Sequence, residues 1–349
     1  MQPDYSRQTL LKEIGAAGQA RLAAARVLVV GAGGLGTPVL QYLAGAGVGS
    51  LGIVDGDTLE ASNLHRQPLY TLADVGKPKT ALARAAIAAL NPTVEVETFA
   101  ERLTAANAMD LVSRFDLVIE CTDNFRTKFL VNDAAVLARK SAVFASVYQY
   151  EGQLQVYRPD AGHACLRCLW PTATADGLVG NCAQAGVLGP VPGVLGTMQA
   201  LLALKVLLGL DGQLAGELLL VDLANFTTLK IKAPRCADCQ APSCARIRCI
   251  VPDESDLELK FASLAEARRA GFEIIDIRNP SEVAERSSGA RHIPMKALLA
   301  DPAALSGPGP YLLLCASGKR SLATARELAR RGIAAKSCVG GLSALPAEG

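Results

Sequence analysis

A set of polar side chains in the first third of the chain has the composition that binds a triphosphate. It lies between an apolar run at 51–54 and an alanine-rich segment that is predicted to be helical over 79–90. Fixed positive charge and hydrogen-bond donors stabilise phosphate oxygens that gain charge during transfer, whereas the nicotinamide of a dinucleotide needs mostly apolar surroundings. The members of the set are Asn63, Arg66, Gln67 and Lys79, and Asp55 and Asp57 precede them in the chain. The set favours ATP over a dinucleotide.

A thiol near the end of the chain is the second candidate for chemistry. The apolar run at 311–315 predicts a strand that delivers Cys315 to a loop, and a helix is expected over 322–331. A thiol at a helix N-terminus beside cations has a lowered pKa and is nucleophilic. Four residues separate Cys315 from Arg320, which suits a single bound sulfur, whereas the loop of cysteine phosphatases has five. We interpret Cys315 as a persulfide site whose charge Arg320 and the loop amides hold.

Two Cys-x2-Cys pairs have the spacing of zinc ligands. Each pair offers two thiolates on one tight turn, and two such turns complete a closed tetrahedral site. The predicted ligands are Cys165, Cys168, Cys236 and Cys239. Two buried thiol pairs without a metal are the alternative, and Cys244 and Cys249 could compete as ligands. The predicted zinc is structural.

The elements that must position these groups begin with a strand, a tight turn and a helix. An apolar run starting at Val27 passes into a turn with glycines at Gly31, Gly33, Gly34 and Gly36, followed by helical spacing. Glycine lets the backbone approach a phosphate, and the helix N-terminus supplies unpaired N–H groups. A second strand ends at Asp55, where a carboxylate can bind ribose hydroxyls. The glycines alone favour a dinucleotide-dependent dehydrogenase.

A third predicted strand, at 117–120, leads to Asp123. Ligands of an open α/β sheet sit at the carboxyl edge of its strands, so Asp123 is a candidate Mg²⁺ ligand beside the phosphates. It is equally a candidate N-cap for a helix over 125–137. Cys121, at the end of the same strand, is expected in the core.

The motifs together resemble the MoeB/ThiF family, the bacterial relatives of the ubiquitin-activating enzymes. The resemblance covers roughly residues 4 to 245 and rests most on 62–67, Ser-Asn-Leu-His-Arg-Gln, beside the glycine turn, 77–79 and 121–124. It implies adenylylation of the C-terminal glycine of a small ubiquitin-fold sulfur-carrier protein.

The same resemblance implies roles for single residues. Asp55 binds ribose, Asn63, Arg66 and Lys79 bind the phosphates, and Asp123 holds magnesium. Arg7, which is otherwise a solvated charge, reaches into the site of a partner subunit in a homodimer. Cys182, in a loop rich in Gly and Pro, corresponds to a thiol that attacks the acyl-adenylate or takes part in sulfur release, and is otherwise an apolar filler.

The C-terminal part resembles a rhodanese in its Asp276-Ile-Arg278 and Ile293-Pro294 elements and in the Cys315 loop. Rhodaneses usually end with Gly-Gly and an aromatic residue, whereas this chain has Leu342 after its two glycines, which puts the packing of the last helix in question. We predict an α/β fold with a Rossmann-like MoeB/ThiF domain and a structural zinc at 1–245, a linker at 246–257 and a small α/β rhodanese domain at 258–349.

Composition agrees with a cytoplasmic enzyme. The chain has 349 residues, a net charge of +2 and ten cysteines. This charge gives no reason to invoke nucleic acid or an anionic membrane. The apolar run at 198–210 is too short and interrupted to span a bilayer, which predicts a buried helix. Charges at 4–13 exclude a signal-peptide pattern, so the cysteines are expected as ligands, catalytic thiols or fillers rather than disulfides.

The two halves together match adenylyltransferase-sulfurtransferases. We expect activation of a carrier ending in Gly-Gly, attack by the Cys315 persulfide and release of a thiocarboxylate. The sulfur donor is expected to be a cysteine desulfurase persulfide or thiosulfate. Molybdopterin, thiamine, cysteine and secondary-metabolite synthesis all use such carriers. The alternatives are a nucleotide-dependent oxidoreductase and a non-catalytic carrier-binding scaffold.

Overall fold

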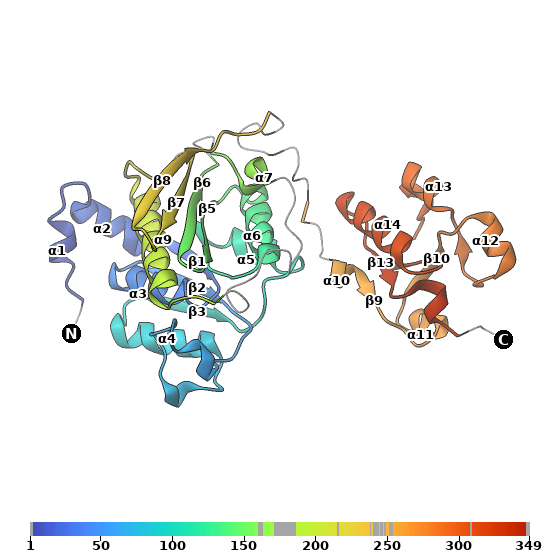
Figure 1. Cartoon of the computed structure of the whole chain (residues 1–349), viewed down its shortest axis with the longest axis horizontal. Coiled ribbons are helices and arrows are strands. Elements are labelled where there is room, and N and C mark those ends of the chain that lie inside the picture. Colours follow the sequence, from blue (N-terminus) through green and yellow to red (C-terminus); the bar gives the residue numbers. More distant parts are fainter. Residues whose placement is uncertain are drawn as a thin grey trace. The chain divides into compact units, whose positions relative to one another are not determined.

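The computed structural model describes residues 3–159, 163–170, 186–214, 216–237, 239, 244, 247, 249–250, 254–307 and 309–346. The chain divides into two compact units, Met1–Ile247 and Arg248–Gly349. Each unit is described by itself (Figure 1).

The described residues of the first unit form an eight-stranded sheet in the order β3-β2-β1-β4-β5-β6-β7-β8. The first five strands along the chain pair in parallel, and β6, β7 and β8 add antiparallel. The strands are β1 Arg26–Val30, β2 Ser50–Val54, β3 Glu95–Phe99, β4 Leu117–Glu120, β5 Ser141–Tyr148, β6 Glu151–Tyr157, β7 Glu217–Asp222 and β8 Thr227–Lys232. Four residues of β1 and all of β4 are buried, as expected for parallel strands covered on both faces.

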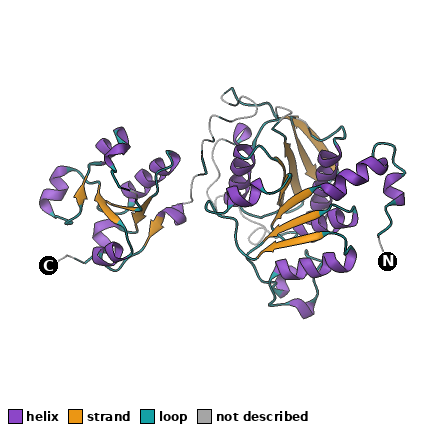
Figure 2. Cartoon of the chain, turned by 180° about the vertical axis from the view of Figure 1, so that it is seen from behind, coloured by secondary structure: helices purple, strands orange, loops and turns teal. Residues whose placement is uncertain are grey.

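Helices cover both faces of the parallel part of this sheet (Figures 1 and 2). α3, α4 and α9 share one hydrophobic core with alternate residues of β1, β4 and β5, and α5 packs with α6 on the other face. The helices are α1 Ser6–Thr9, α2 Gly15–Ala24, α3 Gly36–Gly45, α4 Lys79–Leu90, α5 Ala108–Ser113, α6 Phe125–Leu137, α7 Leu166–Leu169 and α9 Pro190–Leu208. The predicted helices at 79–90 and 125–137 are α4 and α6.

Among the described residues, α9 alone is long and apolar enough to cross a membrane. It begins with a proline in its first turn and ends before Gly209, which has a left-handed φ of 69°. It packs against α3 and β5, and half of its most apolar window is buried inside the unit. The prediction of a buried helix for the apolar run at 198–210 is confirmed.

The N-terminal segment before β1 is not one continuous helix. It forms two helices, α1 and α2, separated by turns in which the amides of Ile14 and Gly15 both bond to Leu11 O. Gly15 has a positive φ of 55°, a conformation that glycine adopts without strain. This glycine breaks the helix.

The described residues of the second unit form a parallel five-stranded sheet in the order β11-β10-β12-β13-β9. Helix α14 covers one face with α10 and α13, and α11 covers the other. The strands are β9 Glu258–Leu259, β10 Glu273–Asp276, β11 Arg291–His292, β12 Tyr311–Leu314 and β13 Ala335–Cys338. The helices are α10 Glu254–Leu257, α11 Leu264–Arg269, α12 Pro280–Glu285, α13 Met295–Ala300 and α14 Lys319–Arg330.

Candidate nucleotide, metal and thiol sites

The glycine turn connects β1 to α3 at the carboxyl edge of the sheet. Gly31 has a φ of 97°, and a Cβ on it would lie 2.8 Å from Cys121 O. A Cβ on Gly36 would lie 2.0 Å from Gly31 O, so the turn closes only with glycine there. At Gly33 the nearest atom to such a Cβ is Gln67 Nε2 at 3.5 Å, and at Gly34 it is Pro192 at 3.2 Å. The turn is tight at its base and open at Gly33.

Asp55 braces this turn from the end of β2. Its Oδ2 accepts a hydrogen bond from the amide of Ala32 at 2.7 Å, and its Oδ1 accepts one from the amide of Asp57 at 2.8 Å. The ends of β1, β2 and β4 are adjacent, because Val30 pairs with both Val54 and Glu120. The Asp55 carboxylate therefore lies at the edge where α/β sheets bind their ligands.

The cationic candidates lie in the connection after β2. Lys79 is the first residue of α4 and is buried, with Nζ 3.3 Å from Asp57 Oδ2. Arg102 Nη2 lies 3.6 Å from the other oxygen of Asp57. Arg66 is partly exposed, and its Nη1 donates to Ser62 O at 3.0 Å. A triphosphate in this connection would compete with Asp57 for Lys79.

Two buried oxygens beside the glycine turn have no hydrogen-bond partner among the described residues. They are Gln67 Oε1 and Thr37 Oγ1, the latter in the first turn of α3. Buried polar atoms are normally paired, so such exceptions indicate a missing partner. Asn63, also buried, is used locally, because its Oδ1 accepts from the amide of Glu60 at 3.3 Å. The orphaned oxygens and the open cradle at Gly33 fit a nucleotide.

Asp123 follows β4 on the same edge. Cys121 N donates to Val30 O at 2.8 Å, which ties the start of this loop to β1. The N-cap of α6 is Asn124, whose Oδ1 accepts from Thr127 N at 2.8 Å. The alternative of Asp123 as N-cap is therefore wrong, because the cap falls one residue later. Its exposed carboxylate is an oxygen donor of the kind that Mg²⁺ prefers.

A buried ion pair behind this loop was missed by the sequence analysis. Lys128 on α6 pairs with Glu120 at the end of β4 and donates to Ala145 O at 2.5 Å. Glu120 also accepts from the amide of Thr122 at 2.7 Å, and Gln199 on α9 donates to Glu120 O at 2.8 Å. The pair fixes the start of the loop that carries Asp123. Lys128 is the fourth residue of the predicted helix over 125–137, and a lysine at such a position does not by itself indicate a buried side chain.

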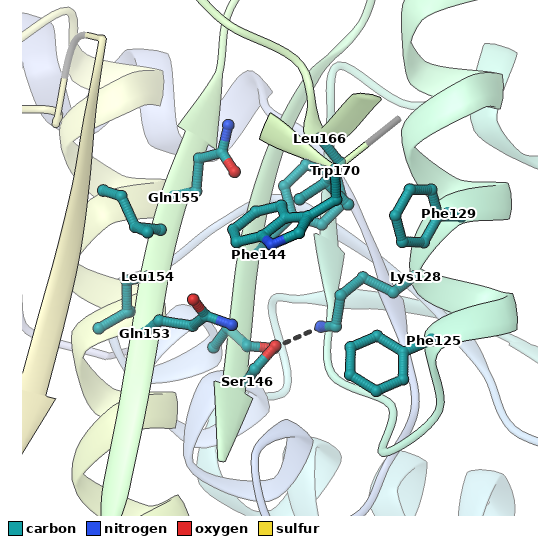
Figure 3. Close-up of a pocket in the computed structure, with 12 residues that line it drawn as sticks. Phe125, Lys128, Phe129, Phe144, Ser146, Gln153, Leu154, Gln155, Leu166 and Trp170 are labelled. Atoms are coloured by element: carbon teal, nitrogen blue, oxygen red, sulfur yellow. Dashed lines mark hydrogen bonds between the residues drawn. The ribbon is translucent and has the colours of Figure 1, made fainter. Parts of the chain in front are cut away.

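Lys128 borders an apolar cavity of about 220 Å³ between α6 and the strands β5 to β7 (Figure 3). Aromatic rings from α6, β5 and the segment after α7 surround it, and they belong to Phe125, Phe129, Phe144 and Trp170. Cys121 does not line this cavity and lies in the hydrophobic core that α3, α4 and α9 share. Its thiol is 3.7 Å from Gln199 Oε1, and burial raises the pKa of the thiol well above the usual value. Cys121 is a core residue, as predicted.

The predicted metal ligands gather in the first unit. The sulfur atoms of three of them, Cys165, Cys168 and Cys239, all lie within 4.8 Å of one another. Cys165 Sγ and Cys168 Sγ are 3.8 Å apart, which is about the separation of two ligands on a tetrahedral zinc with Zn–S bonds of about 2.3 Å. Cys236 Sγ lies 3.1 Å from Cys239 Sγ. Cys236 is outside the group of three sulfurs, so the structure clusters three of the four predicted ligands, and thiolate donors of this kind suit a zinc ion.

A fifth cysteine joins this group, and a sixth does not. Cys244 is buried with its sulfur 2.6 Å from Cys239 Sγ. Cys249 belongs to the second unit, where its thiol donates to the carbonyls of Ala329 and Arg330 at 3.4 and 3.3 Å. Of the two competing cysteines, Cys244 is therefore the one beside the cluster.

The thiol of the second unit lies at the end of β12. Cys315 is buried, and its sulfur accepts from the amide of Ser321 at 3.4 Å and lies 3.4 Å from Ser321 Oγ. Burial alone would raise its pKa, but bonds from the Ser321 hydroxyl and from the amides of Ser321, Ser317 and Gly318 hold the pKa below its usual value. Helix α14 begins at Lys319, three residues before the predicted start, so Arg320 and Ser321 lie in its first turn. The thiol is set up as a nucleophile.

Arg320 forms a salt bridge that the sequence analysis did not predict. Its Nη1 and Nη2 donate to Oε2 and Oε1 of Glu282 at 2.8 and 2.5 Å. Arg278 makes a buried pair with Asp276, with Nη2 2.6 Å from Oδ2. Burial would raise the pKa of Asp276, but hydrogen bonds from Arg278 and Ser288 hold it below its usual value. The predicted Asp-Ile-Arg element is thus a structural ion pair at the end of β10.

The segment after β13 closes over the thiol loop. Leu342 N donates to Cys315 O at 2.8 Å, and a Cβ on Gly341 would lie 2.3 Å from the same oxygen. Gly340 and Gly341 have positive φ values of 71° and 58°. Leu342 is buried in the core against β12 and α11. Leu342 packs here although the aromatic residue is absent.

The remaining predicted residues are Arg7 and Cys182. Arg7 is exposed on α1, and no hydrogen bond or ion pair joins it to another described residue. Cys182 lies outside the described residues.

Comparison with known proteins shows that the model of the ThiF family matches residues 5–244. A sulfur carrier protein adenylyltransferase of Thermus thermophilus is 50% identical over 242 residues, covering 67% of this chain and 89% of that protein. An adenylyltransferase and sulfurtransferase MOCS3 of Bos taurus is 43% identical, and the match covers 84% of this chain and 70% of that protein. The protein of that name from Aedes aegypti is 37% identical, and the match covers 97% of this chain and 85% of that protein.

Solved structures agree on the fold of the first unit. Crystallised E. coli MccB with ATP has a TM-score of 0.60 at 22% identity and covers 68% of this chain and 74% of that chain. A likeness at this identity establishes the fold alone.

Proposed function

Because the chain belongs to the ThiF family, we propose that it adenylylates the C-terminal glycine of a small sulfur-carrier protein and then transfers sulfur to it. The activities for which the relatives from Thermus thermophilus and Bos taurus are named support both steps. The observation that carries the first step is the open glycine cradle with two orphaned buried oxygens beside it.

In the first step the carrier's carboxylate attacks the α-phosphate of ATP, and pyrophosphate leaves. Such a transfer needs alignment and charge stabilisation rather than a protein nucleophile. The backbone of the glycine turn receives the phosphates, and Asp55 binds the ribose hydroxyls. Arg66, Lys79 and Asn63 hold the oxygens that gain charge. Magnesium held by Asp123 would neutralise part of the phosphate charge.

Two further features complete the proposal for the first unit. Cys165, Cys168, Cys236 and Cys239 hold a structural zinc that ties the segment after the sheet to the body of the unit. Arg7 serves the site of a second copy in a homodimer. Its exposure on α1 and its lack of a partner among the described residues support that role.

The second unit acts as a rhodanese. The Cys315 thiolate takes up a sulfur atom, and the terminal sulfur of the persulfide attacks the acyl-adenylate, so that AMP leaves and an acyl disulfide forms. Attack by a second thiol on the Cys315 sulfur releases the carrier thiocarboxylate and leaves a disulfide, which a cellular thiol reduces. Cys182 is our candidate for that second thiol. The carrier is one of those used in molybdopterin, thiamine, cysteine or secondary-metabolite synthesis.

The first test is carrier-dependent exchange of labelled pyrophosphate into ATP, with a panel of small proteins ending in Gly-Gly. We expect exchange with at least one carrier, and its loss when the last glycine is deleted. Binding of NAD(P) without ATP would favour an oxidoreductase, and carrier binding without exchange in zinc-loaded protein would favour a scaffold.

The second test separates the two steps. Cys315→Ala keeps pyrophosphate exchange and loses thiocarboxylate formation from a persulfide donor. Cys182→Ala keeps exchange and slows thiocarboxylate release. A normal rate of release in Cys182→Ala would remove that thiol from the relay.

A further inference from the structure

A carboxylate stands beside the proposed persulfide site. Glu282 contacts both terminal nitrogens of Arg320, at 2.8 and 2.5 Å, in a two-point salt bridge. Its Oε2 also accepts from the amide of Asn279 at 3.0 Å, which fixes the side chain on the first turn of α12. About a third of each side chain in the pair is exposed. The carboxylate is therefore rigidly placed and accessible from solvent.

Arg320 serves two anions at once. Its hydrogen bonds to Glu282 and its interaction with the Cys315 sulfur both raise its pKa, and in return Arg320 lowers the pKa of Glu282 to about 2. Glu282 is thus ionised at every physiological pH and neutralises much of the cation that the loop offers. The neighbouring Arg278 is already paired with Asp276. The loop consequently offers less positive charge than its sequence indicates.

This charge balance matters for the molecule that delivers sulfur. Thiosulfate is a dianion whose two charges would approach Arg320 beside Glu282, whereas a persulfide carries at most one charge on its terminal sulfur. Like charges at close range in a partly desolvated site repel. Resting on the rhodanese function proposed above, we propose that Glu282 is a specificity-determining residue that disfavours dianionic donors and favours persulfides.

Both donors transfer sulfur by the same balanced step. The Cys315 thiolate attacks the outer sulfur, a bond forms between the two sulfurs, and the donor's own S–S bond breaks. Sulfite leaves thiosulfate with the electron pair, and a thiolate leaves a persulfide. Cyanide then removes the sulfur from Cys315 as thiocyanate, so no outside oxidant or reductant is needed.

The test uses Glu282→Gln in the full chain, because glutamine keeps the shape and still accepts from Arg320 and from the amide of Asn279. Glu285→Gln is the matched control, since Glu285 is exposed on the same helix and has no ion pair among the described residues. Thiocyanate formation is measured with thiosulfate and with the persulfide of 2-mercaptoethanol, a monoanion. We expect the KM for thiosulfate to fall about tenfold in Glu282→Gln, with the KM for the persulfide and both values of Glu285→Gln unchanged.

Three other results contradict the inference. An unchanged KM for thiosulfate, or an equal change for both donors, means that Glu282 only positions Arg320. Mass spectrometry that detects the sulfur atom added to Cys315 separates failure of this inference from failure of the proposed function. Absence of the added sulfur in the wild type with both donors overturns the rhodanese assignment and this inference together, whereas sulfur uptake with unaltered discrimination overturns the inference alone.

Discussion

Arg167, inside the first cysteine pair, and Asp133, on α6, form a two-point salt bridge with Nε to Oδ1 at 2.7 Å and Nη2 to Oδ2 at 2.6 Å. The Arg167 guanidinium also stacks 5.1 Å from the ring of Phe129. The amide of Leu166 donates to Asn132 Oδ1 at 2.7 Å, beside the same pair. The candidate metal cluster is therefore tied to the helix whose N-terminus follows Asp123.

Asp133→Asn should destabilise the first unit. The side chains of Asp133 and Arg167 are 9% and 22% exposed, so the change leaves a largely buried guanidinium without its counter-charge. Loss of one partner of a buried pair costs about 3 kcal/mol, or on the order of 8 °C in Tm for a unit of this size. Calorimetry of the full chain measures the shift. Glu97→Gln, in a more exposed pair with Arg114, is the control and should shift stability by less than about 1 kcal/mol.

The elements around the glycine turn were predictable from the sequence, because each depends on local patterns. The strands at 51–54 and 117–120 are apolar runs, and the helices predicted over 79–90 and 125–137 are α4 and α6. The cap of α6 was ambiguous, because Asp123 and Asn124 are both good caps and sequence alone does not fix the backbone at either.

Side-chain contacts between different helices and strands were not predictable. Glu282 and Arg320 are 38 residues apart, and Lys128 reaches Glu120 only because α6 packs over the end of β4. Glu282 and Lys128, taken by themselves, have the pattern of charges on a solvated helix surface. A single sequence carries no signal for such pairs, since the fold and not local composition brings them together.

Arg66→Ala should impair adenylylation more than binding of the carrier. Removal of one preorganised donor to charge that develops during transfer costs about 10²–10³-fold in rate. We expect that loss in pyrophosphate exchange at saturating ATP. Arg84→Ala, an exposed change on α4, is the control and should keep the wild-type rate. Wild-type exchange in Arg66→Ala would remove Arg66 from the site.

Zinc should depend on the cluster of the first unit alone. Cys165→Ser removes one of the three sulfurs that lie within 4.8 Å of one another, so zinc content measured by mass spectrometry should fall and the Tm of the first unit should drop. Cys249→Ser, in the second unit, should keep one zinc per chain. Equal zinc content in the two variants would contradict the predicted ligand set.

The pH dependence of sulfur uptake should follow the thiolate of Cys315. Its pKa lies below the usual value, so the thiolate persists at lower pH, and the rate of uptake should rise with pH and level off earlier than for an ordinary thiol. Ser321→Ala removes the hydroxyl 3.4 Å from the sulfur and should raise the pKa. Uptake near neutral pH should then fall, while the rate at high pH, where both thiols are ionised, stays equal. Ser343→Ala is the control, because that hydroxyl bonds to Ala316 O at 2.7 Å and not to the thiol. The rate of iodoacetamide alkylation against pH measures the shift directly, and superimposed profiles for Ser321→Ala and the wild type would show that the loop amides alone set the pKa of Cys315.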